Sequence, residues 1–408
     1  MWIYFLIVRI ASLWNAKARL LVRGQAAALS LLSEQVRQGD SWIWFHAASS
    51  GEFEQARPVI GRLRAAEAAA GRRSKVLVTF FSPSGYEMHK GCEEADMVTY
   101  LPFATRRNAR RFVTLLQPRM AVFIKYEYWP AYLRELRRQQ VPVFSVASIF
   151  RPGQAFFRPL IGPVYRRLLR CFTCLLVQDE ASQQRLARYG ITRTAVCGDP
   201  RFNRVLEVAA SSAPDALVDR FAADGAPLIV AGSTWPHDER LLARYVAGHP
   251  GVRLLLVPHE IDDRHLHLIF QLFQGRIVRY SEATERNADT CRVMVVDRMG
   301  MLARLYRYAT VAYVGGGFGA GIHNTLEAAA YGVPVVWGPR WQRFREAEGL
   351  IGAGAGFSIR NYKELSAVLD TQLAAPGEAG RKAEDYVRSE HDAAERICRE
   401  LLASVEKS

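Results

Sequence analysis

The sequence predicts an α/β protein made of two Rossmann-like, doubly wound parallel-sheet domains. Three observations support this prediction. The chain has 408 residues, about the length of two ordinary domains. Short apolar runs alternate with amphipathic stretches, a pattern typical of βαβ units. The alternation is interrupted once, by a stretch rich in Ala, Ser, Pro and Gly, and then resumes.

The expected strands of the first half are separated by helical patterns such as 107–116 and 129–139. These strands are 42–45, 75–81, 97–101, 120–124, 141–147 and 175–178. The expected strands of the second half are 228–231, 252–257, 293–296, 311–314 and 333–337. The last ~25 residues have the pattern of one charged amphipathic helix. The predicted divisions are a segment 1–24, a domain 25–206, a linker 207–225 and a domain 226–408 that includes the terminal helix.

Residues 1–14 are nearly all apolar, and basic residues follow at positions 17, 19 and 23. This run is too short to span a bilayer, which takes ~20 apolar residues. Aromatic and aliphatic residues beside basic ones are typical of a helix that lies in the membrane interface. The alternative is a helix packed on the body of the protein. We favour the interface, because an exposed apolar stripe needs a partner.

The net charge of +14 indicates an anionic partner. The basic clusters of the first half are 72–75, 106–111, 134–138 and 166–170. Each alone is typical of a solvated helix face, but their concentration in one half favours a partner. No RNA-binding signature with interleaved aromatics is present, so nucleic acid is not expected. Cys171 and Cys174 form a lone C-x-x-C, which indicates reduced thiols and a cytoplasmic protein.

Three predicted strands of the first half end in residues suited to chemistry. Residues 42–52 form a strand, a small-residue loop and a helix start, so Glu52 would lie at the mouth of the sheet as a general base. Ser49-x-x-Glu52 also has the form of a capping box, and spacing alone favours that cap. Ser82-Pro-Ser84-Gly forms a second strand-to-helix turn, where an anion could bind.

Charged residues follow two further strands. Lys125 and Glu127 end an apolar strand, where they would pair with each other or with solvent, or face a cleft. Arg201, near the end of the first domain, would point toward the cleft between the domains. There it could bind a phosphate or carboxylate bidentately.

The densest motif is a glycine loop. Residues 313–327 place Gly315, Gly316 and Gly317 after a strand, and a helix is expected to follow. Glycine permits close backbone approach, and a helix N-terminus offers free N–H groups to a phosphate. The pattern fits neither G-x-G-x-x-G nor a Walker A loop. Glu327 could bind ribose hydroxyls, or form a cap with Asn324; the glycine density favours function.

Other strand ends of the second half contribute candidate residues as well. They are Ser233 and Thr234, Pro258 and His259, and the helix start at Met299, Gly300 and Met301. His259, Glu260, His265 and His267 lack the H-E-x-x-H spacing, so no metal site is expected.

Taken together, these segments resemble the 3-deoxy-D-manno-octulosonic acid (Kdo) transferase family of lipid A assembly. The family shows a strand, then His, small residues and Gly-Glu, matched by His46 to Glu52. Its Glu-x-Glu-Leu-Trp-Pro segment corresponds to residues 125–130, and its Gly-Asn-x-Lys-Phe-Asp segment to residues 198–203. Its Gly-Gly…Gly-His-Asn-x-Leu-Glu motif is matched by residues 315–327. The likeness covers nearly the whole chain in the right order.

The resemblance implies a GT-B fold, with two domains facing a central cleft, and inverting transfer of Kdo from CMP-Kdo to a lipid A precursor, lipid IVA. It implies no cofactor, no metal and no obligate protein partner. It places the enzyme on the anionic inner membrane, at the cytoplasmic side.

The resemblance also assigns residue roles. Glu52 matches the base, and Arg201 replaces a lysine that stabilises the transition state. Lys125 replaces a glutamate, which reverses the charge; Glu127 completes the expected catalytic set. The residues expected to bind CMP are Ser233, Thr234, Pro258, His259, Met299, Gly300, Met301, Gly315, Gly316, Gly317, His323, Asn324, Thr325, Leu326 and Glu327. The residues expected to bind the acceptor are His46, Ser49, Ser50, Arg57, Ser82 and Ser84.

Two other functions remain open from the sequence. A different GT-B enzyme, such as one that uses UDP-N-acetylglucosamine, would share the second domain but not the Gly51-Glu52 and Trp129-Pro130 pairs. A non-catalytic basic protein that binds lipid or nucleic acid would explain the charge but not the glycine loop.

Overall fold

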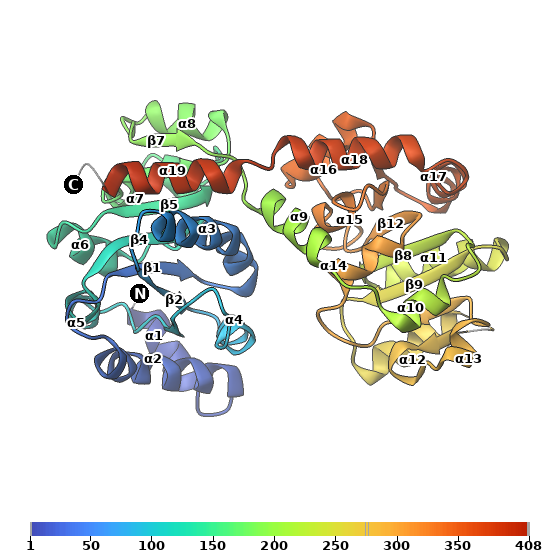
Figure 1. The fold of residues 1–408 in the computed structure, drawn as a ribbon, viewed down its shortest axis with the longest axis horizontal. Helices are drawn as coiled ribbons and strands as arrows, with labels where there is room; N and C mark the ends of the chain where they lie inside the picture. Colours follow the sequence, from blue (N-terminus) through green and yellow to red (C-terminus); the bar gives the residue numbers. More distant parts are fainter. Residues whose placement is uncertain (1, 274, 276, 406–408) are drawn as a thin grey trace. The chain divides into compact units, whose positions relative to one another are not determined.

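The computed structural model describes residues 2–273, 275 and 277–405, which divide into two compact units (Figure 1). The first unit extends to Arg204 and also contains the segment that begins at Asp392. The second unit runs from Val205 to His391. The chain therefore passes between the units twice.

The first unit contains a seven-stranded parallel sheet with strand order β3-β2-β1-β4-β5-β6-β7. Its strands are β1 (Trp42–Ala47), β2 (Lys75–Phe80), β3 (Met97–Tyr100), β4 (Pro118–Ile124), β5 (Val143–Ser148), β6 (Cys174–Val177) and β7 (Thr194–Val196). The strand order reverses between β1 and β4. The carboxyl ends of these two strands therefore flank the switch point at which α/β sheets bind ligands.

Helices cover both faces of this sheet. The helices of the first unit are α1 (Trp2–Ala11), α2 (Ala16–Gln35), α3 (Ser50–Ala69), α4 (Pro83–His89), α5 (Arg106–Leu116), α6 (Pro130–Arg138), η1 (Ala155–Phe157), α7 (Gly162–Leu169), α8 (Glu180–Ala187) and α19 (Ala393–Val405). Helix α9 (Arg201–Ser211) begins in the first unit and continues into the second. Apolar residues of α3 and α19 share one core cluster. Residues of α2, α5, α6, α7 and α8 share the cluster on the opposite face. The strands β1, β2, β4, β5 and β6 are thus buried on both sides, which explains their continuous apolar runs, whereas the edge strand β7 is only partly buried.

The second unit also contains a seven-stranded parallel sheet, with order β10-β11-β9-β8-β12-β13-β14. Its strands are β8 (Leu228–Thr234), β9 (Arg253–Pro258), β10 (Ile277–Arg279), β11 (Val293–Val295), β12 (Val311–Val314), β13 (Val335–Trp337) and β14 (Gly356–Ser358). Its helices are α10 (Ala216–Phe221), α11 (Pro236–Gly248), α12 (Asp263–Leu272), η2 (Tyr280–Glu282), α13 (Glu285–Ala288), α14 (Leu302–Leu305), η3 (Tyr306–Tyr308), α15 (Leu326–Ala329), α16 (Arg345–Ala353), α17 (Tyr362–Ala374) and α18 (Gly377–Ser389). The switch point of this sheet lies between β8 and β12.

The predicted fold class is confirmed. Every strand expected from the sequence forms, with ends shifted by at most a few residues. The sequence analysis missed β7, β10 and β14, which are three-residue strands at sheet edges. An edge strand that short has no long apolar run to reveal it.

Three boundaries differ from the predicted ones. The carboxyl-terminal helix is two helices, α18 and α19, and α19 packs against α3 in the first unit instead of in the second. Helical periodicity reveals an apolar face but not the core that buries it. The predicted boundary at residue 24 lies inside α2, whose Leu21 and Leu32 are both buried. The predicted linker 207–225 contains α10, which buries Val218 and Phe221.

The amino-terminal apolar run forms α1, although the side chains of residues 1–5 lie outside the described part. Beyond them, Leu6, Ile7, Ile10, Leu13 and Trp14 are all exposed. Within the described residues, no helix is both long and apolar enough to cross a membrane.

Candidate functional site

Glu52 lies in the first turn of α3, directly after β1. Its carboxylate oxygen Oε2 accepts a 2.6 Å hydrogen bond from the backbone N–H of Ala48. In a capping box the N–H of Ser49 would donate instead, and the Ser49 side chain would bond the helix in return. Ser49 is the N-cap by position, but its side chain makes no such bond. The capping box that the spacing favoured is therefore wrong.

Burial raises the pKa of Glu52 above its usual value, although the Ala48 hydrogen bond opposes this. The nearby Glu127 carboxylate raises the pKa further, whereas Lys125 and His46 lower it. Glu52, Lys125, Glu127 and His46 therefore lie within electrostatic reach of one another, at the β1–β4 switch point. A carboxylate with a raised pKa is suited to accept a proton near neutral pH.

His46 is fully buried at the end of β1. Its Nε2 accepts a hydrogen bond from the Trp129 indole at 3.0 Å, so we assign the ring proton to Nδ1, which lies 2.9 Å from Thr79 Oγ1. A Glu127 oxygen lies 3.7 Å from Nε2. Because both ring nitrogens have protein partners, His46 positions Trp129. The sequence analysis expected His46 to bind the acceptor directly; in the structure both of its ring nitrogens already contact protein groups.

Lys125 adopts the left-handed conformation, with φ of 55°. Its carbonyl accepts hydrogen bonds from Ser145 at 3.1 Å and Ser148 at 2.7 Å, which hold this strained backbone. Strain of this kind costs about 1–3 kcal/mol and is concentrated at functional sites. The strand end thus fixes where the lysine side chain starts.

Arg201 begins α9 and forms a salt bridge with the buried Asp199, with 2.7 Å between Nη2 and Oδ2. Burial acts to raise the pKa of Asp199, but Arg201 and then Lys125 outweigh it, so this pKa is lowered. The first unit therefore brings Lys125 and Arg201 around one ionised carboxylate, in the same neighbourhood as Glu52.

The serines predicted to bind an acceptor lie at the starts of α3 and α4, directly after β1 and β2. Ser50 Oγ lies 2.8 Å from His89 Nε2, and Ser82 Oγ caps the Gly85 N–H and contacts Ser84. Arg57 of α3 is held by Glu54 of the same helix and by Glu94, which follows α4. Acceptor binding by these residues stays a prediction.

In the second unit, the glycine loop packs tightly against the end of β8. A Cβ on Gly315 would lie 2.3 Å from the carbonyl oxygen of Ser233, closer than atoms can approach. Gly316 has φ of 87°, a conformation that favours glycine. Asp238 holds the loop, because it accepts hydrogen bonds from the Gly316 N–H at 3.0 Å and the Tyr313 hydroxyl at 2.8 Å.

A cavity of about 340 Å³ opens beside this loop, at the β8–β12 switch point. It is lined by Ser233, Gly300, Leu302, Ala303, Tyr306, His323, Asn324 and Glu327. Five of these are residues expected to bind CMP. Of the other predicted residues, Pro258, Met301, Thr325 and Leu326 are buried, whereas the Met299 side chain is 73% exposed.

The helix expected after the glycine loop is short. It is α15, which has four residues and begins at Leu326. Asn324 Oδ1 accepts the Leu326 N–H at 3.2 Å, and the Asn324 amide donates to Glu327 at 2.9 Å. So short a helix has little macrodipole. Any anion held here would therefore depend mainly on loop N–H groups and side chains.

An aromatic stack that the sequence analysis missed stands beside this cavity. Trp235 stacks on His259 with ring centroids 4.8 Å apart, and His259 stacks on His323 at 4.5 Å. Burial, and then the neighbouring His259, lower the pKa of His323. Trp235 directly follows Ser233 and Thr234, and this adjacency could have pointed to it.

Comparison with known proteins gives a match to a protein family, similar sequences and similar solved structures. Residues 18–204 match the family described as 3-deoxy-D-manno-octulosonic-acid transferase (kdotransferase). The 3-deoxy-D-manno-octulosonic acid transferase of Aquifex aeolicus is 25% identical over 85% of this chain and 90% of its own length. That of Bordetella pertussis is 27% identical over 77% and 75%, respectively. The solved UDP-GlcNAc 2-epimerase of Neisseria meningitidis has a TM-score of 0.63 at 12% identity, covering 90% of this chain and 100% of its own.

These comparisons and the two parallel sheets define a glycosyltransferase of the GT-B fold. At 12% identity the epimerase shows the fold alone, whereas the sequence relatives share a more specific likeness. They confirm the resemblance noted in the sequence: the chain is a relative of the 3-deoxy-D-manno-octulosonic acid transferases, the enzymes that transfer Kdo in lipopolysaccharide biosynthesis.

Proposed function

We propose that this protein transfers one or more Kdo residues from CMP-Kdo to a lipid A precursor, lipid IVA, with inversion at the anomeric carbon. The observation that carries the proposal is the placement of Glu52. It is a carboxylate with a raised pKa, at the switch point of a domain that matches the Kdo transferase family. The 340 Å³ cavity of the second unit supports a nucleotide donor site.

The proposed chemistry is a single displacement. An acceptor hydroxyl oxygen attacks the anomeric carbon of Kdo, while the bond from that carbon to the phosphate oxygen breaks. CMP leaves with the bonding electron pair, and Glu52 takes the hydroxyl proton. Lys125 and Arg201 would stabilise the negative charge that develops on the leaving phosphate. We propose that no metal ion takes part, so a chelator is expected to leave the rate unchanged.

The test is transfer of Kdo from CMP-Kdo to lipid IVA by the wild type and by Glu52→Gln. Glutamine can still accept the Ala48 N–H, so the fold is expected to survive, while the rate should fall by about 10²–10⁴-fold. Glu87→Gln is the control, because Glu87 is an exposed residue of α4 that pairs with Lys90.

Near-normal turnover of Glu52→Gln would show that the base lies elsewhere. If the wild type is inactive with CMP-Kdo but active with another sugar nucleotide, that sugar nucleotide replaces CMP-Kdo as the proposed donor.

We further propose that the protein binds the cytoplasmic side of the inner membrane through α1 and the turn that follows it, which contains Leu13 and Trp14. Exposed apolar residues of this segment lie beside Arg9, Lys17 and Arg19, a combination typical of interfacial binding. Replacing both Leu13 and Trp14 by serine should reduce co-sedimentation with anionic vesicles roughly tenfold or more. Leu268→Ser, at an exposed position of α12, should leave it unchanged. Equal loss in both variants would contradict binding through α1 and the turn that follows it.

A further inference from the structure

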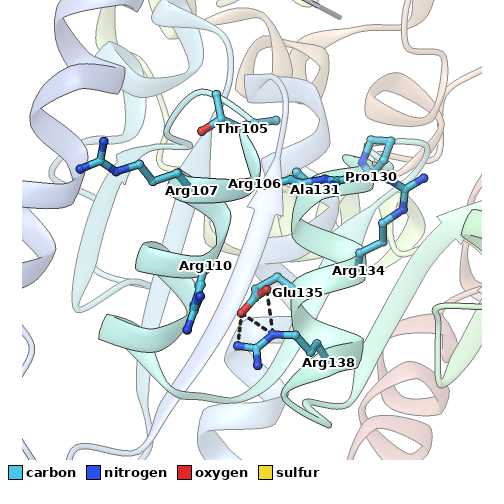
Figure 2. Close-up of a pocket in the computed structure, with 10 residues that line it drawn as sticks. Thr105, Arg106, Arg107, Arg110, Pro130, Ala131, Arg134, Glu135 and Arg138 are labelled. Carbon is cyan, nitrogen blue, oxygen red and sulfur yellow. Dashed lines mark hydrogen bonds and ion pairs between the residues drawn. The ribbon is translucent and has the colours of Figure 1, made fainter.

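A second, larger cavity of about 810 Å³ lies on the first unit between α5 and α6 (Figure 2). It is lined by Ala104, Thr105, Arg106, Arg107, Arg110, Pro130, Ala131, Arg134, Glu135 and Arg138. We call it the arginine pocket. Five of its ten lining residues are arginines, and Glu135 is its one carboxylate.

Most of this positive charge has no partner. Arg138 binds Glu135 through several contacts, the shortest at 2.6 Å, and Figure 2 shows this pair at one end of the pocket. Within the described part of the chain, the side chains of Arg106, Arg107, Arg110 and Arg134 form no hydrogen bond or salt bridge with the protein. Arg110 also acts electrostatically on Glu135, so most, but not all, of the positive charge at the opening is uncompensated.

The spacing of the arginines along α5 and α6 concentrates the positive charge of the arginine pocket instead of neutralising it. Arg106 and Arg110 are four residues apart on α5, as are Arg134 and Arg138 on α6, and like charges at this spacing destabilise a helix. Neither helix has an acidic residue in its first turn, although anions there would be favourable. Exposure to solvent would explain an arginine-rich face on one of these helices. It does not explain why both helices direct arginines toward the same cavity.

The arginine pocket adjoins the candidate active site. Its rim includes Pro130, and the preceding residue, Trp129, binds His46 beside Glu127. From Pro130, the Arg134 and Arg138 positions lie about 6 and 12 Å along α6, given a rise of ~1.5 Å per residue. A molecule the size of a disaccharide could therefore reach from these arginines toward the carboxyl end of β4.

The pocket also adjoins the apolar amino-terminal helices. α2 packs against α5, and α1 packs against α2. Arginines beside apolar surface are suited to an amphiphile with an anionic head. Guanidinium groups bind phosphate oxygens bidentately, and the spread of the four groups fits a head larger than a single phosphate.

We propose that the arginine pocket binds a phosphate monoester carried on the sugar head of the glycolipid acceptor, and so positions the acceptor hydroxyl for transfer. This inference rests on the proposed function for the identity of the acceptor. It assigns acceptor recognition to the arginines of α5 and α6, which lie outside the motifs of the family resemblance.

The test compares two charge-matched double variants. Arg110→Glu with Arg134→Glu reverses two charges inside the arginine pocket. Arg111→Glu with Arg137→Glu reverses the neighbouring, exposed positions outside it on the same two helices. Circular dichroism and thermal unfolding first establish that both variants fold as the wild type does.

The first arm measures transfer to the phosphorylated acceptor and to the same acceptor with its phosphates removed, both in neutral detergent micelles. The pocket variant should raise KM for the phosphorylated acceptor by about 10–100-fold, with kcat within twofold. It should leave KM for the dephosphorylated acceptor unchanged, and the control variant should behave as the wild type. An equal rise for both acceptors, or an equal rise in the control variant, would overturn the proposal.

The second arm does not depend on catalysis. Calorimetry measures binding of the deacylated glucosamine disaccharide bisphosphate, which should weaken by a similar factor only in the pocket variant. If the wild type transfers no Kdo yet shows this loss of binding, the arginine pocket stands and the proposed reaction fails. If only binding to vesicles of anionic phospholipid is lost, the pocket recognises bulk lipid headgroups and the acceptor assignment is wrong.

Discussion

The environment of Glu52 decides its chemistry, and that environment comes from residues distant in the sequence. The motif around residues 46–52 identified Glu52 as a candidate, but the spacing to Ser49 favoured a cap that does not form. The sequence could not show that Lys125 and Glu127 act on the pKa of Glu52 in opposite directions. Neither could it show that Asp199 pairs with Arg201. Both facts depend on how β1, β4 and the start of α9 converge.

These opposed effects predict two opposite pH shifts. A base acts only when ionised, so the rate should fall as the pH drops through the pKa of Glu52. Glu127→Gln removes a charge that raises this pKa, so the acidic limb of the kcat profile should move to lower pH. Lys125→Met removes a charge that lowers this pKa, so the limb should move to higher pH.

Each shift is expected to be about half a unit to one unit, given the usual size of such effects. The measurement is kcat against pH, with saturating donor and acceptor. Shifts in the same direction for both variants would contradict Glu52 as the group that sets the acidic limb.

At the scale of elements, strand ends proved more predictable than the helices that follow them. Fully buried strands give unbroken apolar runs, so β1 and β12 were found together with the residues that end them. The start of α15 was not predicted, because glycine density indicates a loop but not its length. The packing of Gly315 against Ser233 explains at least one of these glycines sterically.

Gly315→Ala should therefore damage the donor site through the backbone. The added Cβ would force the glycine loop away from the end of β8, and we expect KM for CMP-Kdo to rise about tenfold or more. Gly319→Ala is the matched control in the same loop, because its Cβ would meet only the Gly316 carbonyl at an ordinary 3.5 Å. Steady-state kinetics with varied donor separates the two variants. Equal effects would show that the close approach at Gly315 is unimportant.

At the scale of the whole molecule, the sequence did not predict which unit contains α19. Its apolar face is evident from the sequence, but either unit could have buried that face. The structure places Ile397 and Leu401 in the core cluster with α3, and the Asn203 side chain accepts the Ala394 N–H at 3.1 Å. The family likeness gives no help here, because its motifs end well before residue 392.

Leu401→Ala should therefore destabilise the first unit selectively. Its side chain is fully buried, and a cavity of this kind typically costs 2–5 kcal/mol. Hydrogen exchange should accelerate in the strands β1–β7 and stay unchanged in β8–β14. Arg399→Ala, at an exposed position of the same helix, should have little effect. Faster exchange confined to the second unit would contradict the observed packing.

The return of the chain to the first unit also bears on the order in which the protein can be made. Synthesis begins at the amino terminus, yet one face of the first domain lacks part of its cover until residues 393–401 have left the ribosome. During that interval the part of the core cluster that α19 completes would stay open to water. The second domain, whose residues 205–391 are contiguous, can complete its own core first. The domain translated first is thus the one finished last.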